Sequence, residues 1–136
     1  MIVGVTGNRG GLSAQQHLWL ISQIKGARAL HHGACVGADT DAHLAARDAG
    51  VAIIVHPPTD MRLVELRDTS ESLVHWLQPL PYMERNHNIV NACDVLWAFP
   101  SGPERVRSGT WATVRYAVKN KKTVVIVHPL GTVEVR

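Results

Sequence analysis

The chain has 136 residues, of which 46% are hydrophobic and 18% charged, and its net charge is +3. A chain of this length fits one domain with one core, so residues 1–136 are predicted to form a single domain. No apolar run approaches the ~20 residues that cross a bilayer, and the first residues lack the basic leader of a signal peptide. We therefore expect a cytoplasmic protein without membrane contact, whose modest positive charge permits an anionic ligand or nucleic acid without requiring either.

Five short apolar runs, each followed by small or polar residues, predict β-strands at residues 2–5, 29–32, 51–55, 95–99 and 123–127. Three of these runs are almost continuously apolar, which is typical of strands buried on both faces of a parallel sheet. A first helix is expected to begin after Ser13, with Gln16 completing a capping box, and to end at Gly26. Further helical patterns lie at residues 39–49, 84–92 and 109–120.

This alternation of strands and helices predicts an α/β fold. We expect a single Rossmann-like three-layer domain, with a mostly parallel sheet of five strands or slightly more and helices on both faces. The segment 56–81 contains four prolines and fits the pattern least well. It is interpreted as a short helix or two and as a candidate lid.

Three glycine-bearing turns follow predicted strands, and ligands of open parallel sheets bind beyond the carboxyl ends of the strands. Glycine lets main-chain N–H groups approach an anion, and a helix N-terminus adds a partial positive charge. The third turn has Arg105 and Arg107 beside it, and its serine is alternatively a simple helix N-cap. The ligand-binding residues predicted from these turns are Gly7, Asn8 and Arg9 in the first, Gly33, Gly37, Ala38 and Asp39 in the second, and Ser108, Gly109 and Thr110 in the third.

Arg85 and Asn86 lie near the start of the third predicted helix. A guanidinium group can contact a phosphate or carboxylate through two parallel hydrogen bonds, so these two residues are predicted to clamp the ligand. The alternative is a surface arginine paired with Glu84 or another acid.

Motifs for common cofactors and metals are missing from the sequence. The pattern Gly4-x-x-Gly7-x-x-Gly10 is not the dinucleotide fingerprint G-x-G-x-x-G, and no Walker motif occurs. The eight histidines lack H-x-x-x-H spacing, and Cys35 and Cys93 form no C-x-x-C pair. We therefore predict no cofactor, no metal and reduced cysteines.

The run R-N-H-N-I-V from Arg85 to Val90, followed by an apolar strand and Ser108-Gly109-Thr110, resembles two motifs of DNA-processing protein A, the Smf family. Those motifs are R-N-x-x-I-x and S-G-[ST], in its Rossmann domain. The stretch CVGADTDAHLAARDAGVAIIVHP is similar to the G-x-A-x-G-x-D-x-x-A-H stretch of the same family. The resemblance covers most of the chain and implies a Rossmann-like domain that commonly pairs into dimers.

The layout also resembles the LOG phosphoribohydrolases, which are often labelled lysine decarboxylase-like. Their P-G-G-x-G-T-x-x-E motif is interrupted here by a basic insertion, and Thr113 stands where their catalytic glutamate belongs. Cleavage of an N-glycosidic bond needs a nearby carboxylate, so the catalytic residues of such an activity are unknown. The acids expected near the rim are Asp39, Asp41, Glu84 and Glu104.

The sequence therefore predicts binding of a nucleotide or nucleotide-derived phosphate ligand at the carboxyl edge of the sheet. The alternatives are a phosphoribohydrolase that acts on a nucleotide and a binder of single-stranded nucleic acid. For the last of these, Trp111 is a candidate to stack on a base, although packing is the favoured reading.

Overall fold

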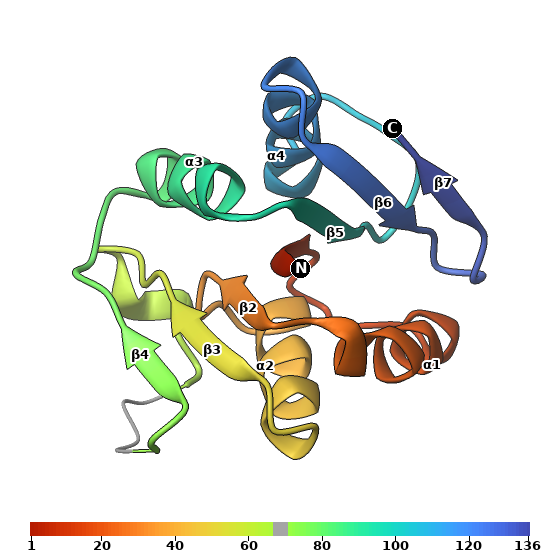
Figure 1. Cartoon of the computed structure of the whole chain (residues 1–136). Coiled ribbons are helices and arrows are strands. Elements are labelled where there is room, and N and C mark those ends of the chain that lie inside the picture. The colour runs from red at the N-terminus through yellow and green to blue at the C-terminus, as the bar shows by residue number, and fades with distance from the viewer. Residues whose placement is uncertain (67–70) are drawn as a thin grey trace.

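The computed structural model describes residues 1–66 and 71–136, and within them a seven-stranded sheet has the order β4-β3-β2-β1-β5-β6-β7 (Figure 1). Strands β1 to β6 pair in parallel, and β7 is antiparallel to β6. The strands are β1 Ile2–Gly7, β2 Ala29–His32, β3 Ala52–Val55, β4 Val74–Trp76, β5 Val95–Phe99, β6 Thr123–Val127 and β7 Val133–Val135.

The mostly parallel sheet is confirmed, but it is larger than five strands. All five predicted strands are present, and the two additional strands, β4 and β7, are three residues long and lie at the edges. Each is held by main-chain bonds to its neighbour, such as Leu77 N to Val55 O at 2.9 Å and Arg136 N to Val124 O at 2.8 Å. Runs this short carry no periodic signal of their own, because a neighbouring strand rather than their own sequence fixes their conformation.

The four predicted helices are confirmed to within two residues at each end, apart from the end of the first. They are α1 Ala14–Gln23, α2 Ala38–Asp48, α3 Tyr82–Ala92 and α4 Gly109–Lys119, with 3-10 turns η1 Ile24–Gly26 and η2 Met61–Leu63. The predicted capping box is present, because the Ser13 hydroxyl accepts from Gln16 N at 3.1 Å and the Gln16 side chain accepts from Ser13 N at 2.9 Å. The end of α1 is tightened into η1, which stops at Gly26 as expected.

Gln16 also fixes the start of α1 to the carboxyl ends of two strands. Its buried amide donates to the carbonyl of Pro100 at 2.9 Å and to that of Val127 at 2.8 Å. The Ser13 hydroxyl donates to the carbonyl of Pro129 at 2.7 Å. These bonds satisfy buried carbonyl groups where β5 and β6 end, and they make the carboxyl edge of the sheet a defined surface.

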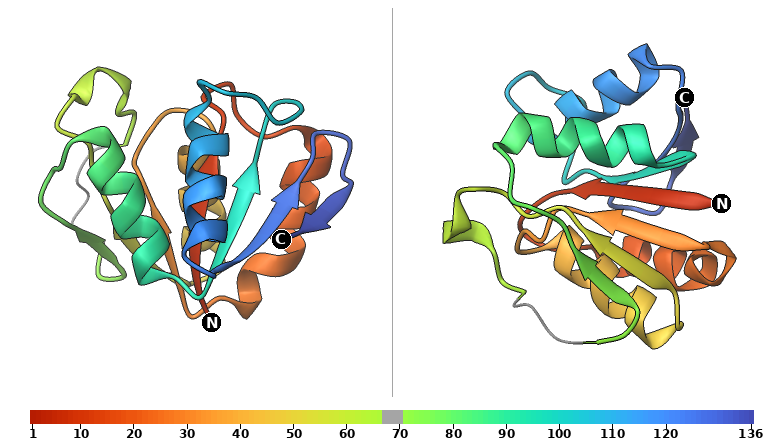
Figure 2. Two further views of the ribbon diagram at one scale, coloured as in Figure 1. Left: turned by 90° about the horizontal axis from the view of Figure 1, so that it is seen from above. Right: turned by 60° about the vertical axis from the view of Figure 1, so that its left-hand side comes forward.

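The core lies on the two sides of β5, all of whose residues are buried. One cluster contains residues of α1 and α2 together with Val95, Trp97 and Phe99. The second contains residues of α3 and α4 together with Leu96 and Ala98. In Figure 1, α1 and α2 accordingly lie together below β1 and β2, and α3 and α4 lie above. In Figure 2 (left), β5 points towards the turn that leads into α4.

The segment 56–81 contains the short 3-10 helix η2, which agrees with the predicted short helix, and also the strand β4. Residues 67–70, which the lid prediction included, lie outside the described residues. None of the described residues of this segment lines the pocket between β1 and β5 that is described below. The candidate lid stays a prediction, and β4 lies at the edge of the sheet, next to β3.

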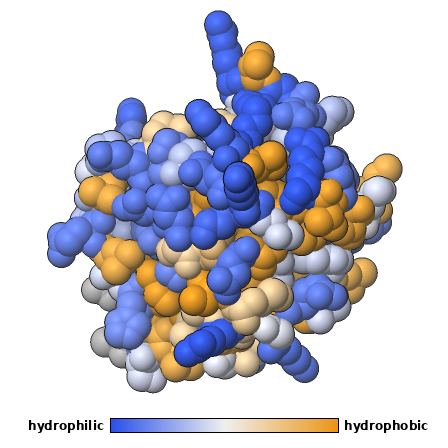
Figure 3. Space-filling model, turned by 45° about the horizontal axis from the view of Figure 1, so that its top comes forward, coloured by the Kyte–Doolittle hydropathy of each residue, from blue (hydrophilic) through white to orange (hydrophobic). Residues whose placement is uncertain are grey.

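The molecular surface is mixed in character. Figure 3 shows hydrophilic side chains over most of the upper half of the face in view, with hydrophobic residues interspersed below. Within the described residues, no helix is both long and apolar enough to span a membrane.

Candidate functional site

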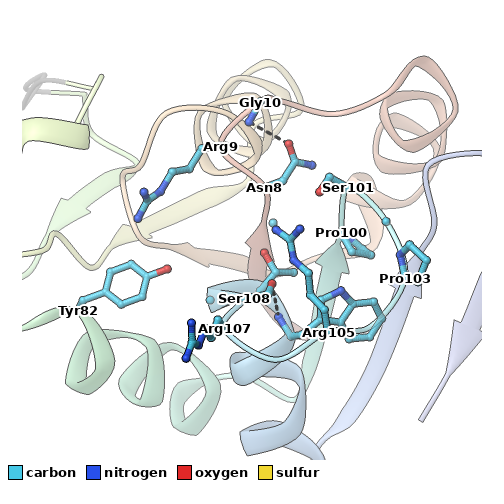
Figure 4. Close-up of a pocket in the computed structure, with 15 residues that line it drawn as sticks. Asn8, Arg9, Gly10, Tyr82, Pro100, Ser101, Pro103, Arg105, Arg107 and Ser108 are labelled. Carbon is cyan, nitrogen blue, oxygen red and sulfur yellow. Dashed lines mark hydrogen bonds between the residues drawn. The ribbon is translucent and has the colours of Figure 1, made fainter.

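A pocket of about 650 Å³ opens at the carboxyl edge of the sheet between β1 and β5, and we call it the β1/β5 pocket (Figure 4). Its lining comprises residues 7–10, 100–103 and 107–111, together with Tyr82 and Arg105. The strand order explains its place, because the chain runs from β1 outward through β2, β3 and β4 and then returns to the other side of β1. The turn after β1 leads to α1 on one face and the turn after β5 to α4 on the other, which leaves a crevice between them.

The turn after β1 is held against β5 by Asn8. The main-chain N–H of Asn8 and its side-chain amide both donate to the carbonyl of Phe99, each at 3.2 Å, and its side-chain oxygen accepts from Gly10 N at 2.9 Å. A Cβ added at Gly7 would collide with Ala38 of α2. Gly7 and Asn8 therefore shape the wall of the pocket through packing and hydrogen bonds.

The first turn of α4 presents main-chain donors to the pocket. The Ser108 hydroxyl accepts from Trp111 N at 3.3 Å, and the Ser108 carbonyl accepts from Ala112 N at 2.8 Å, so the predicted alternative of an N-cap is confirmed. Among the described residues, none accepts a hydrogen bond from the N–H groups of Gly109 or Thr110. Free N–H groups at the start of an eleven-residue helix favour an anion.

The charge of the pocket is positive. Arg9, Arg105 and Arg107 line it, and no aspartate or glutamate does so among the described residues. None of the three arginine side chains forms an ion pair with a described acid, whereas the adjacent Glu104 is paired with Arg115 at 3.1 Å and with Arg136 at 3.0 Å. Figure 4 shows Arg9 and Arg105 extending from opposite turns.

The second predicted turn lies behind this pocket rather than in it. Gly37 has a φ of +89° and packs against the main chain of Arg9, and Ala38 N donates to the carbonyl of Asn8 at 3.0 Å. Gly37 lines a second, open hollow together with Thr40 and Asp41, and this hollow adjoins the β1/β5 pocket at Arg9 and Gly10. Gly33, Ala38 and Asp39 line neither the β1/β5 pocket nor that hollow, so the structure brings together the first and third turns and places the second as their support.

Asp39 is bonded within its own turn. Its carboxylate accepts from Cys35 N at 3.2 Å, and burial raises the pKa of Asp39 to about 6, against the opposing charge of Arg85. Asp39 lies in the first turn of α2, and Gly37 occupies the N-cap position.

Arg85 requires the largest correction. Its side chain is only 2% exposed and donates to the carbonyls of Gly33 and His56, the latter at 3.1 Å. Its guanidinium carbon lies 4.9 Å from the centre of the Tyr82 ring. Arg85 and the buried Asn86 do not line the pocket, so neither the predicted clamp nor the alternative surface pair with Glu84 describes this arginine. A helical position that faces the sheet is buried whatever its polarity, and the sequence did not reveal which face that was.

Four buried histidines form two pairs at the end of β2. His31 Nδ1 lies 2.8 Å from His56 Nε2, and His32 Nε2 lies 2.9 Å from His43 Nδ1. Burial lowers the pKa of all four, that of His56 to about 4. No group of three or more metal-ligating side chains is arranged to hold a metal within the part of the chain that the structure describes.

These histidines predict a loss of stability in acid. A histidine whose folded pKa lies below its unfolded value binds fewer protons in the folded state, so stability present above about pH 6.5 is lost as the pH falls towards 4. The pKa of Asp39 is raised in the folded state, so its protonation stabilises the fold as the pH falls from 6 to 4 and offsets part of this loss. We expect the free energy of unfolding in urea to fall by about 1–3 kcal/mol between pH 7 and 4.5.

A matched pair of variants tests whether the buried histidines cause this pH dependence. His56→Gln should flatten the pH dependence, whereas the exposed control His75→Gln should leave it unchanged. Equal pH slopes in wild type and His56→Gln would show that the buried pairs do not cause it.

Comparison with known proteins gave matches among solved structures alone, since no family model and no curated protein sequence matches the chain. The molybdenum cofactor binding protein from Rippkaea orientalis aligns at 24% identity and a TM-score of 0.67, over 93% of this chain and 76% of that one. The molybdenum cofactor carrier protein from Chlamydomonas reinhardtii aligns at 26% identity and a TM-score of 0.62, over 92% and 74%.

DNA processing protein A from Streptococcus pneumoniae aligns at 23% identity and a TM-score of 0.69, over 91% of this chain. The chain spans about half of that protein, 49% of its length. The fold and the crevice at its carboxyl edge thus define a Rossmann-like domain. The predicted resemblance to DNA processing protein A is confirmed at the level of the fold.

Proposed function

We propose that the β1/β5 pocket binds the phosphate group of a nucleotide or nucleotide-derived compound. The observation that carries the proposal is a set of donors in a pocket whose lining includes no described carboxylate. These donors are three arginines that form no ion pair with a described acid, and the N–H groups of Gly109 and Thr110, which have no described acceptor. Charge-assisted hydrogen bonds of this kind are about twice as strong as neutral ones. The volume of about 650 Å³ suits a whole small molecule rather than an isolated phosphate ion.

Binding is favoured over cleavage. Thr113, at the position that matches the LOG glutamate, is buried, and its hydroxyl donates to the carbonyl of Gly109 at 2.8 Å. The Thr113 hydroxyl is therefore bonded within α4 rather than directed at a ligand. A threonine also cannot stabilise an oxocarbenium-like centre as a carboxylate does. The phosphoribohydrolase alternative has no acid among the described lining residues to support it.

A second candidate ligand is the molybdenum cofactor. The likeness to the carrier protein from Chlamydomonas reinhardtii, at 26% identity over most of both chains, supports it. Carrying a cofactor is binding without conversion, which agrees with a lining of donors and no described acid.

Single-stranded nucleic acid is less well supported. Trp111, the candidate for stacking on a base, is 2% exposed and packs in the cluster beneath α4. Proteins of that kind need exposed aromatic platforms along a basic groove. Tight binding of oligonucleotides with a steep dependence on salt would favour this alternative over ours.

Self-association into a dimer stays a prediction.

The binding experiment is calorimetry with nucleoside 5′-monophosphates and diphosphates, ADP-ribose and the molybdenum cofactor. Arg105→Ala should weaken the binding of phosphorylated compounds about 3- to 20-fold, because it removes one charge-assisted bond. Lys119→Ala, at the far end of α4, removes the same charge outside the pocket and should change the affinity less than about 2-fold. Absence of heat with every compound would overturn the proposal.

A further inference from the structure

We propose that Tyr82 is a ligand-binding residue of the β1/β5 pocket, and that its hydroxyl donates to a terminal phosphate monoester. This inference rests on the function proposed above and deepens it by naming the class of phosphate. Tyr82 is the first residue of α3 and lines the pocket opposite the turn after β1. In Figure 4 its hydroxyl points into the hollow, towards the start of α4.

The position of the hydroxyl is defined by Gly109. A Cβ built on Gly109 would collide with the Tyr82 oxygen, so the phenol occupies the space that any other side chain would fill. The Tyr82 hydroxyl has no hydrogen-bond partner among the described residues, and the N–H groups of Gly109 and Thr110 beside it are free as well. The phenol at the start of α3 and the two N–H groups at the start of α4 thus belong to the same side of the pocket lining.

Arg85 is the positioning residue for this phenol. Its guanidinium lies 4.9 Å from the centre of the Tyr82 ring and is itself fixed by the carbonyls of Gly33 and His56, where β2 and β3 end. A cation over an aromatic face attracts the ring, and here the cation is buried and cannot move away. The ends of β2 and β3 thereby hold the Tyr82 hydroxyl in the pocket between β1 and β5.

The number of donors favours a monoester. A terminal phosphate monoester presents three non-bridging oxygens and up to two negative charges, whereas a diester presents two such oxygens and one charge. An amide N–H, the phenol and an arginine can each contact a different oxygen of a monoester. A compound with a terminal phosphate should therefore bind more tightly than a cyclic diester of the same base and sugar.

The test compares 5′-AMP with 3′,5′-cyclic AMP in wild type, Tyr82→Phe and Tyr116→Phe. Wild type should bind 5′-AMP more tightly than cyclic AMP. Tyr82→Phe should weaken the binding of 5′-AMP about 5- to 20-fold and the binding of cyclic AMP much less. Tyr116→Phe is the matched control, since it removes the other tyrosine hydroxyl of the chain, which is bonded to Asn91 at 3.0 Å outside the pocket.

A spectroscopic measurement distinguishes direct contact of Tyr82 with the ligand from an indirect effect of the substitution on the fold. In the Tyr116→Phe background Tyr82 is the sole tyrosine, so its 13Cζ resonance is a single signal. This signal should move and saturate as 5′-AMP or inorganic phosphate is added. If wild type binds none of the compounds of the calorimetric panel, the proposed function fails and the inference fails with it. If wild type binds another compound of the panel but neither 5′-AMP nor inorganic phosphate, the inference alone is overturned. If wild type binds 5′-AMP but Tyr82→Phe binds it equally well, or the resonance stays still at saturation, the inference alone is overturned.

Discussion

Gly109→Val is expected to reduce the affinity for a phosphorylated ligand by at least about 100-fold. The new side chain would occupy the place of the Tyr82 hydroxyl and cover the free N–H groups at the start of α4. Loss of two or three hydrogen bonds to a charged group accounts for this magnitude, since each contributes about 1.5–3 kcal/mol. The measurement is calorimetry with the tightest compound found for wild type.

Gly26→Val is the matched control for this prediction. A Cβ at Gly26 meets no atom within 4 Å, and Gly26 lies after α1 and outside the pocket. The control should bind as wild type does. An unchanged affinity in Gly109→Val, with the fold intact by circular dichroism, would exclude the start of α4 from the binding site.

Arg85→Met is expected to lower the free energy of unfolding by about 2–4 kcal/mol. Methionine fills much of the space, but the carbonyls of Gly33 and His56 lose their donor, and each unsatisfied buried group costs about 1–3 kcal/mol. Relief of a buried charge offsets part of this loss, because Arg85 Nε has no hydrogen-bond partner among the described residues. Urea unfolding at pH 7.5 measures the difference.

The control for Arg85 is Arg28→Met, which changes an exposed arginine that forms no ion pair with a described acid. Its effect should stay within about 0.5 kcal/mol. Should Arg85→Met retain wild-type stability yet lose ligand affinity as strongly as Gly109→Val, Arg85 would be a direct clamp after all, as the sequence first suggested.

Several features were predictable because they are local. The alternation of apolar runs and amphipathic segments predicted the five longer strands and four helices, and the spacing of Ser13 and Gln16 predicted a capping box that the structure contains. Such features depend on residues within one or two turns, so the sequence expresses them directly. The short edge strands β4 and β7 were missed, because their partners rather than their own residues make them strands.

The site was predictable only in part. Gly7, Asn8, Arg9, Ser108, Gly109 and Thr110 were predicted as ligand-binding residues, and all six line the β1/β5 pocket. Tyr82 was missed, although it stands beside the Arg85 motif. The sequence did not single it out, because a tyrosine at a helix start can have many roles. Its place in the pocket becomes evident only from its contact with Gly109, which the tertiary structure shows.

By itself, the sequence determined that this protein is an α/β domain with glycine-bearing turns at the strand ends, since strand and helix patterns and turn residues act over short distances. Only the tertiary structure decided which turns meet. The strand order places β5 beside β1 and separates the turn after β2 from the pocket, and it buries Arg85 beneath Tyr82. These outcomes depend on contacts between residues about 30 to 100 positions apart, which no local pattern encodes.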